Sequence, residues 1–149
     1  MAQTYFGSTV RAGSGTLTDT VDGGFMVLAQ TATATTVAAG TAVTSTITIP
    51  ANSQIIDLII DCTTVPVAGA GTATAVNATI GTAASGTQYL SATDVIAGGR
   101  ASLSFTAAQL TAIGDVGSNT TVAFTVDPNG TVSTTQGVYR LTVVYAQKV

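Results

Sequence analysis

The chain has 149 residues, a net charge of −3 and only 7% charged residues, and it lacks histidine, tryptophan and glutamate. Acid–base catalysis, nucleophilic catalysis and transition-metal binding draw largely on His, Cys, Glu and Lys, and the chain has one cysteine, Cys62, and one lysine, Lys148. This composition argues against an enzyme and against any cofactor or metal. Its four scattered basic residues argue against nucleic-acid binding, and no apolar run reaches the roughly 18–20 residues of a membrane span.

Residues 1–22 are rich in Gly, Ser and Thr and show little periodicity, apart from the adjacent aromatics Tyr5 and Phe6. We interpret this segment as an extended N-terminal arm, followed by one domain over residues 23–149. Ordering the arm costs about 1–2 kcal/mol of backbone entropy per residue, so we expect it to become ordered against another subunit, with Tyr5 and Phe6 as the anchor. The alternative is a frayed terminus.

The next 40 residues alternate between apolar and polar side chains, the pattern of half-buried strands. In the third predicted strand, Gln54–Thr64, one face carries Ile56, Leu58, Ile60 and Cys62, and the other carries Ile55, Asp57, Ile59 and Asp61. We assign the first set to the core, with Cys62 as a small core residue. The predicted strands of this region are Phe25–Ala32, Ala42–Ile49 and Gln54–Thr64.

The mixed face of the third strand could hold a metal ion at its aspartates or contact another surface through its isoleucines. Asp57 and Asp61 are four residues apart, roughly 13 Å along a strand, which is too far for one metal ion to bridge. Isoleucines beside aspartates on a sheet face would expose apolar surface in a monomer. Ile55 and Ile59 are therefore predicted to contact a partner or a covering segment.

The second half predicts more strands and one short helix. In the closing strand, one face carries Tyr139, Leu141, Val143 and Tyr145, and we assign this face to the core. Thr106 is positioned to cap the helix and Gly114 to end it. The strand spacing predicts an all-β fold, an antiparallel β-sandwich of about seven or eight strands that is jelly-roll-like. The predicted strands are Thr72–Ile80, Ala101–Phe105, Thr120–Val126 and Gln136–Gln147; the helix is Thr106–Ile113, and a helical turn is predicted within Tyr89–Val95.

Other candidate sites are weak. Asp19 and Asp22 lie in a Gly-flanked segment, but an EF-hand needs a glutamate that the chain lacks. A Ser–His–Asp triad is impossible without histidine. The glycine-rich stretches lack the G-K-[ST] ending of a phosphate-binding loop. The start of the chain has no apolar signal segment, which predicts synthesis and retention in a cytoplasm until assembly.

Four motifs resemble a recurring pattern in small β-sandwich virion proteins of tailed bacteriophages. An I-P-A motif opens a strand of alternating aliphatics, a strand ending in I-G-T leads to Y-L-S-A-T-D-V, and a G-x-Y-x-L-T-V-x-Y strand closes the domain. The resemblance covers roughly residues 47–147. The matches lie at Ile49–Ala51, Ile80–Thr82, Tyr89–Val95 and Gly137–Tyr145.

The resemblance implies a structural protein on the capsid surface of a virion, made in the host cytoplasm. The leading hypothesis is a capsid decoration (cement) protein that bridges major capsid protein subunits, as a homo-oligomer such as a trimer. The alternative is a tail-fibre, neck or host-surface adhesion module. The family supplies no catalytic residues to carry over.

Overall fold

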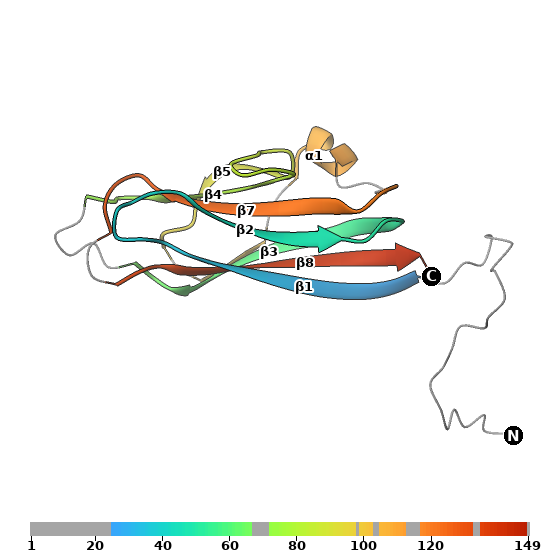
Figure 1. The fold of residues 1–149 in the computed structure, drawn as a ribbon, viewed down its shortest axis with the longest axis horizontal. Coiled ribbons are helices and arrows are strands. Elements are labelled where there is room, and N and C mark those ends of the chain that lie inside the picture. Colours follow the sequence, from blue (N-terminus) through green and yellow to red (C-terminus); the bar gives the residue numbers. More distant parts are fainter. Residues whose placement is uncertain are drawn as a thin grey trace, which may run out of the picture.

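The computed structural model describes residues 25–66, 72–97, 99–102, 105–112, 117–132 and 135–148. These residues form eight strands and one short helix, which Figure 1 labels in chain order. The arm, residues 1–22, lies outside the described residues. The elements are β1 (Phe25–Thr35), β2 (Val43–Ile49), β3 (Ser53–Thr64), β4 (Val76–Gly81), β5 (Leu90–Asp94), β6 (Gly99–Ser102), α1 (Ala107–Ala112), β7 (Thr120–Pro128) and β8 (Val138–Lys148).

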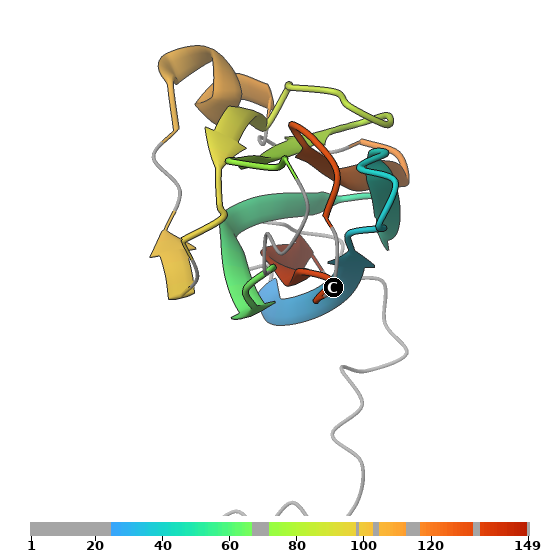
Figure 2. The ribbon, with the colours of Figure 1, turned by 90° about the vertical axis from the view of Figure 1, so that its left-hand side faces the viewer.

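The strands form two packed antiparallel sheets (Figures 1 and 2). One sheet has the order β1-β8-β3-β6 and the other has the order β2-β7-β4-β5. Chain-distant strands therefore pair in both sheets, as β1 does with β8 and β2 with β7. Two four-stranded sheets connected in this order make a jelly roll. The predicted all-β jelly-roll sandwich is confirmed.

The core lies between the sheets and is built from the inward side of each alternating strand. In β2 burial increases along the strand, and Ile47 and Ile49 are buried while Thr46 and Thr48 are exposed. In β8 every second residue is buried, as predicted. Those four are Tyr139, Leu141, Val143 and Tyr145.

Side chains bridge the two sheets where edge strands β1 and β2 lie near each other. Gln30 Nε2 donates to the Tyr145 hydroxyl (2.8 Å) and to the backbone carbonyl of Thr48 (3.3 Å). From β2, the Ser45 hydroxyl donates to the carbonyl of Thr33 on β1 (2.6 Å). Unpaired edge groups invite pairing with other chains, and these bonds satisfy two of the edge carbonyls.

In the second half of the chain, the predicted short helix is confirmed, whereas the predicted helical turn is wrong because that segment is a strand. Thr106 Oγ1 accepts a bond from the Gln109 backbone N–H, and Gln109 Oε1 accepts one from the Thr106 N–H. This reciprocal pair is a capping box. The helical turn predicted within Tyr89–Val95 is instead strand β5, paired with β4. Leu90 is buried in the core there, and tertiary pairing outweighs local propensity.

Candidate interaction surface

The outer face of the β1-β8-β3-β6 sheet carries a patch of small apolar side chains at the end where β1 begins. The strand register sets Val27 opposite Ala146, and Ala29 opposite Val144. On the other side of β8, strand β3 adds Ile56 and Ile59, and the partly buried Asp57 lies between them, opposite Val144. We call these six residues the apolar patch. Its members are Val27, Ala29, Ile56, Ile59, Val144 and Ala146.

The patch is uncovered by the described part of the chain. Val27 is 64% exposed and Ile56 is 50% exposed. Ala29 is also exposed, while Ile59, Val144 and Ala146 are partly buried by their neighbours. Single exposed apolar residues are common, but contiguous apolar patches mark interaction sites. This face is therefore the best candidate for a contact with another surface.

A β-bulge in β3 determines which isoleucines reach this face. The register of β3 on β8 shifts between Ile55, which lies opposite Tyr145, and Asp57, which lies opposite Val144. Ile56 is the extra residue, and it is turned outward. The prediction that Ile55 contacts a partner is wrong, because Ile55 is 2% exposed and packs in the core.

Ile59 stays a candidate contact. It is partly exposed on the outer face and lies opposite Thr142 of β8. The other two predicted contacts, Tyr5 and Phe6, lie outside the described residues. Sequence reasoning missed Ile56, which it placed in the core, and it did not single out Val27 or Val144 as part of a surface. The alternation in β1 and β8 was the available signal for the last two.

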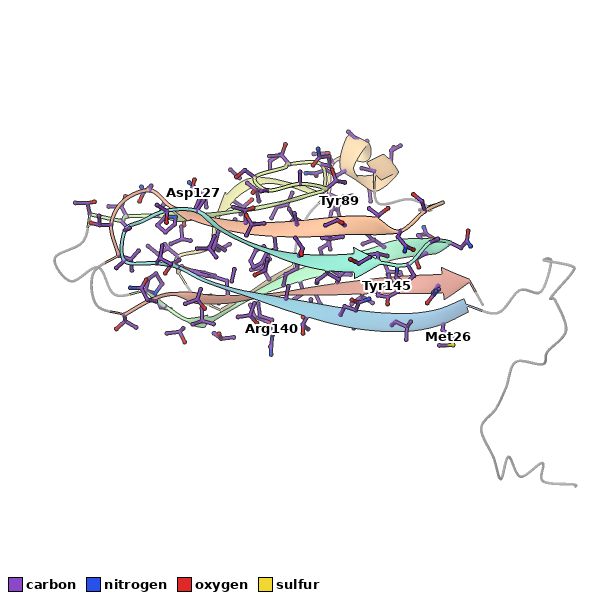
Figure 3. The ribbon with its side chains drawn as sticks, viewed as in Figure 1. Met26, Tyr89, Asp127, Arg140 and Tyr145 are labelled. Carbon is purple, nitrogen blue, oxygen red and sulfur yellow. The ribbon has the colours of Figure 1, made fainter. Side chains whose placement is uncertain are left out.

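Beyond the patch, the same face becomes polar. Arg140 Nη2 lies 3.0 Å from Asp61 Oδ2, and the two residues are direct cross-strand partners. Figure 3 shows Arg140 on the outer side of the sheet. Asp61 is buried although it faces outward, whereas the Arg140 side chain is 45% exposed. The ion pair therefore forms one boundary of the apolar patch.

The opposite outer face, on the β2-β7-β4-β5 sheet, has a different character. Its β2 row consists of Thr44, Thr46 and Thr48, all exposed. The β4–β5 loop covers part of the face, and the Ser85 backbone N–H donates to Thr125 Oγ1 (2.9 Å). Thr125 Oγ1 also lies 2.8 Å from the hydroxyl of Thr44. This face is polar and serves as a natural control for the apolar patch.

Cys62 and Tyr139 form the most perturbed titratable pair in the described chain. Burial is the main reason that the pKa of the Cys62 thiol is raised above its ordinary value of 9.0. Burial also raises the pKa of the Tyr139 hydroxyl, and the nearby Cys62 and Asp94 add to that effect. A thiol with a raised pKa is a poor nucleophile at neutral pH. Cys62 packs against the core from a partly buried position, as predicted.

No cluster of three or more His, Cys, Asp or Glu side chains among the described residues is arranged to hold a metal ion. No helix within the described ranges is long and apolar enough to cross a membrane.

Comparison with known proteins adds no relative. No protein-family model, no curated protein and no solved structure significantly matches the chain.

Proposed function

We propose that this chain is a structural virion protein of a tailed bacteriophage, most specifically a capsid decoration protein. It binds the outer surface of the capsid as a homo-oligomer and bridges neighbouring capsid subunits. Its action is mechanical: it adds contacts between subunits and so resists the outward pressure of packaged DNA. The proposal rests on motif resemblance, on composition and on the uncovered apolar patch.

The observation that carries the proposal is the apolar patch on the outer face of one sheet, in a chain that carries little charge. Only 7% of residues are charged, against about a quarter in an average globular domain. Permanent contact favours such a surface, because burying an unpaired charge is costly. Val27 and Ile56 would be covered in an assembled particle, which explains why they are exposed in the single chain. The jelly roll is a common architecture of viral capsid domains.

The alternative, a glycan-binding adhesion module, has less support. Carbohydrate platforms use exposed aromatic rings, and the chain has no tryptophan and four tyrosines. Tyr89, Tyr139 and Tyr145 are all buried. Within the described residues, no tyrosine ring is therefore available as a stacking platform.

A rebinding assay tests the proposal. Purified protein is added to phage heads stripped of it, and bound protein is measured after sedimentation. We expect saturable binding by the unmodified chain and at least about tenfold weaker binding by Ile56→Asp, which replaces the half-exposed isoleucine with a second charge beside Asp57. Thr46→Asp on the opposite face is the matched control and should bind as the unmodified chain does. Equal binding of all three proteins would contradict the role given to the patch.

A further inference from the structure

Strand β1 is an edge of its sheet, and within the described residues β8 is its only neighbour in that sheet. Its 11 residues pair with β8 without a register shift, and none of them is charged or a proline. Figure 1 shows this strand along the lower boundary of the fold. Natural sheet edges are usually short, bulged, charged or interrupted by proline, because an open edge is a template for another strand. Strand β1 has none of these protections.

The other edges are shorter or already blocked. Strands β6 and β5 have four and five residues, and β2 has seven and is followed by Pro50. Where β3 extends beyond its pairing with β6, the Leu58 backbone N–H donates to the carboxylate of Asp57 (2.8 Å). The longest unprotected edge of the described chain is therefore β1.

A side-chain contact shows which backbone groups of β1 point outward. The carbonyl of Thr33 accepts a bond from Ser45 of β2 (2.6 Å), so it points away from β8. Because this direction alternates with a period of two along an antiparallel strand, the N–H and C=O groups of Val27, Ala29 and Thr31 point outward as well. No described residue bonds to these groups. The half of β1 nearest Phe25 is thus the open half.

The open half matches a second copy of itself. In an antiparallel pair about a two-fold axis, Val27 would lie opposite Ala29 of the second copy, and Phe25 opposite Thr31. This register has four closely spaced pairs and about eight hydrogen bonds between the chains. It also stops before Thr33, whose carbonyl is already bonded. Such an isologous contact closes on itself and leaves no free end for further growth.

The side chains of β1 permit this self-pairing. Like charges directly opposite each other destabilise a strand pair, and β1 has no charged residue. On the outer face, Val27 is 64% exposed and Ala29 is also exposed. In the two-fold register these two small apolar side chains would cover each other across the new pair, in both halves of the dimer.

We propose that two copies of this chain pair antiparallel through β1, so that their β1-β8-β3-β6 sheets join into one continuous sheet. The inference goes beyond the virion role, because the contact forms between copies of the free chain. It would stand even if the protein bound no capsid, and capsid binding could fail or succeed independently of it.

Sedimentation equilibrium of the full-length chain over about 1–100 µM tests the pairing, and we expect a dimer. Ala29→Pro removes an outward N–H but keeps the ladder with β8, so it should weaken the dimer at least about tenfold. Thr46→Pro is the matched control on the edge strand β2, where the Thr48 carbonyl, bonded to Gln30, marks the same outward phase. It should leave the dimer unchanged.

Ala29→Lys keeps the backbone N–H and places two like charges near the two-fold axis, so it tests the contact even if the proline variant does not fold. It should also weaken the dimer at least about tenfold, by repulsion across the strand pair. A chain that stays monomeric over the whole range would overturn the proposal. So would a dimer that Ala29→Lys leaves intact, or one that Thr46→Pro weakens equally.

Disulfide cross-linking between two single-cysteine chains tests the register. With Cys62→Ala in both, a Val27→Cys chain is mixed with an Ala29→Cys chain, and mixed disulfides are measured by mass. Opposite residues of a closely spaced pair have Cα atoms about 5.5 Å apart, within disulfide range. The control replaces Ala29→Cys with Thr33→Cys, also exposed but roughly 13 Å farther along the strand.

We expect the Val27–Ala29 combination to cross-link at least about tenfold faster than the Val27–Thr33 control, because only the first pair lies within disulfide range. Equal rates in the two mixtures would overturn the proposed pairing, since they would indicate association without this register. A faster reaction in the control would also overturn it.

Discussion

Ile55 and Leu58 lie three residues apart in β3, and both point into the same core, exposed by 2% and 0%. In a regular strand, residues an odd number apart face opposite sides. The bulge at Ile56 changes the phase, so that Ile55 pairs inward with Tyr145 and Leu58 pairs inward with Val143. The same bulge places Ile56 on the outer face. One inserted residue thus allows both Ile55 and Leu58 to face the core and itself contributes Ile56 to the apolar patch.

The bulge predicts that two consecutive isoleucines differ sharply in their contribution to stability. Ile55→Ala should lower the free energy of unfolding by about 2–5 kcal/mol, because it leaves a cavity in the core. Ile56→Ala should change it by less than about 1 kcal/mol, since the side chain is half exposed. Denaturant unfolding of the two variants provides the measurement. Similar losses from both substitutions would mean that the bulge is misplaced.

The bulge also marks the limit of what the sequence could predict. The run Ile55-Ile56-Asp57-Leu58-Ile59-Ile60 offers an isoleucine to the core in either phase. The phase depends on the register with β8, more than 80 residues away in the chain, and register is not a local property. In β8 the apolar residues alternate without ambiguity, and there the sequence predicted the buried face correctly.

The two helical predictions also separate what a local sequence signal can predict from what depends on distant strands. The helix at Thr106 could be predicted because its capping box is local: Thr106 and Gln109 satisfy each other's backbone N–H groups. The segment after Tyr89 had no such signal. It forms β5 because Leu90 pairs with Ile80 and is buried, and these contacts exist only after the second sheet has formed.

The raised pKa of Tyr139 predicts a loss of stability at alkaline pH. The folded protein holds the hydroxyl proton above the ordinary pKa of 10.0, whereas the unfolded chain releases it there. The unfolded state therefore binds fewer protons above pH 10, and the free energy of unfolding falls as pH rises, by up to about 1.4 kcal/mol per pH unit for each such group.

Tyr139→Phe isolates this contribution. The buried Tyr139 hydroxyl makes no hydrogen bond of ordinary geometry, and the Cys62 thiol beside it is only a weak hydrogen-bonding group, so the variant should be about as stable as the unmodified chain at pH 8. It should also lose less stability between pH 8 and pH 11. Unfolding curves at the two pH values provide the comparison, and a parallel loss in both proteins would argue against the tyrosine as the source.

The ion pair between Asp61 and Arg140 predicts a modest, salt-sensitive contribution to stability. Asp61→Asn should lower the free energy of unfolding by about 1 kcal/mol, a value kept small because the Arg140 side chain is 45% exposed. The loss should shrink in 1 M salt, which screens exposed charges. Asp127→Asn, at an exposed position, is the control. A larger effect at Asp127 than at Asp61 would contradict the assignment.

Deleting residues 1–15 should separate folding from attachment. The deletion removes Tyr5 and Phe6 but none of the described core, so far-ultraviolet circular dichroism should still show a β-rich domain. Binding to stripped heads should weaken by at least about tenfold, because burial of two aromatic side chains can contribute several kcal/mol. Undiminished binding by a folded, truncated protein would show that the segment is only a frayed end.

The central claim, that this chain decorates a capsid, is tested most directly by counting its copies in purified phage particles. Quantitative mass spectrometry would give the molar ratio of this chain to the major capsid protein, and negative-stain images of labelled particles would locate it. The account predicts many copies, in a fixed ratio to the capsid protein and spread over the head. A few copies confined to the tail or neck would contradict it, and would favour a fibre or adhesion module instead.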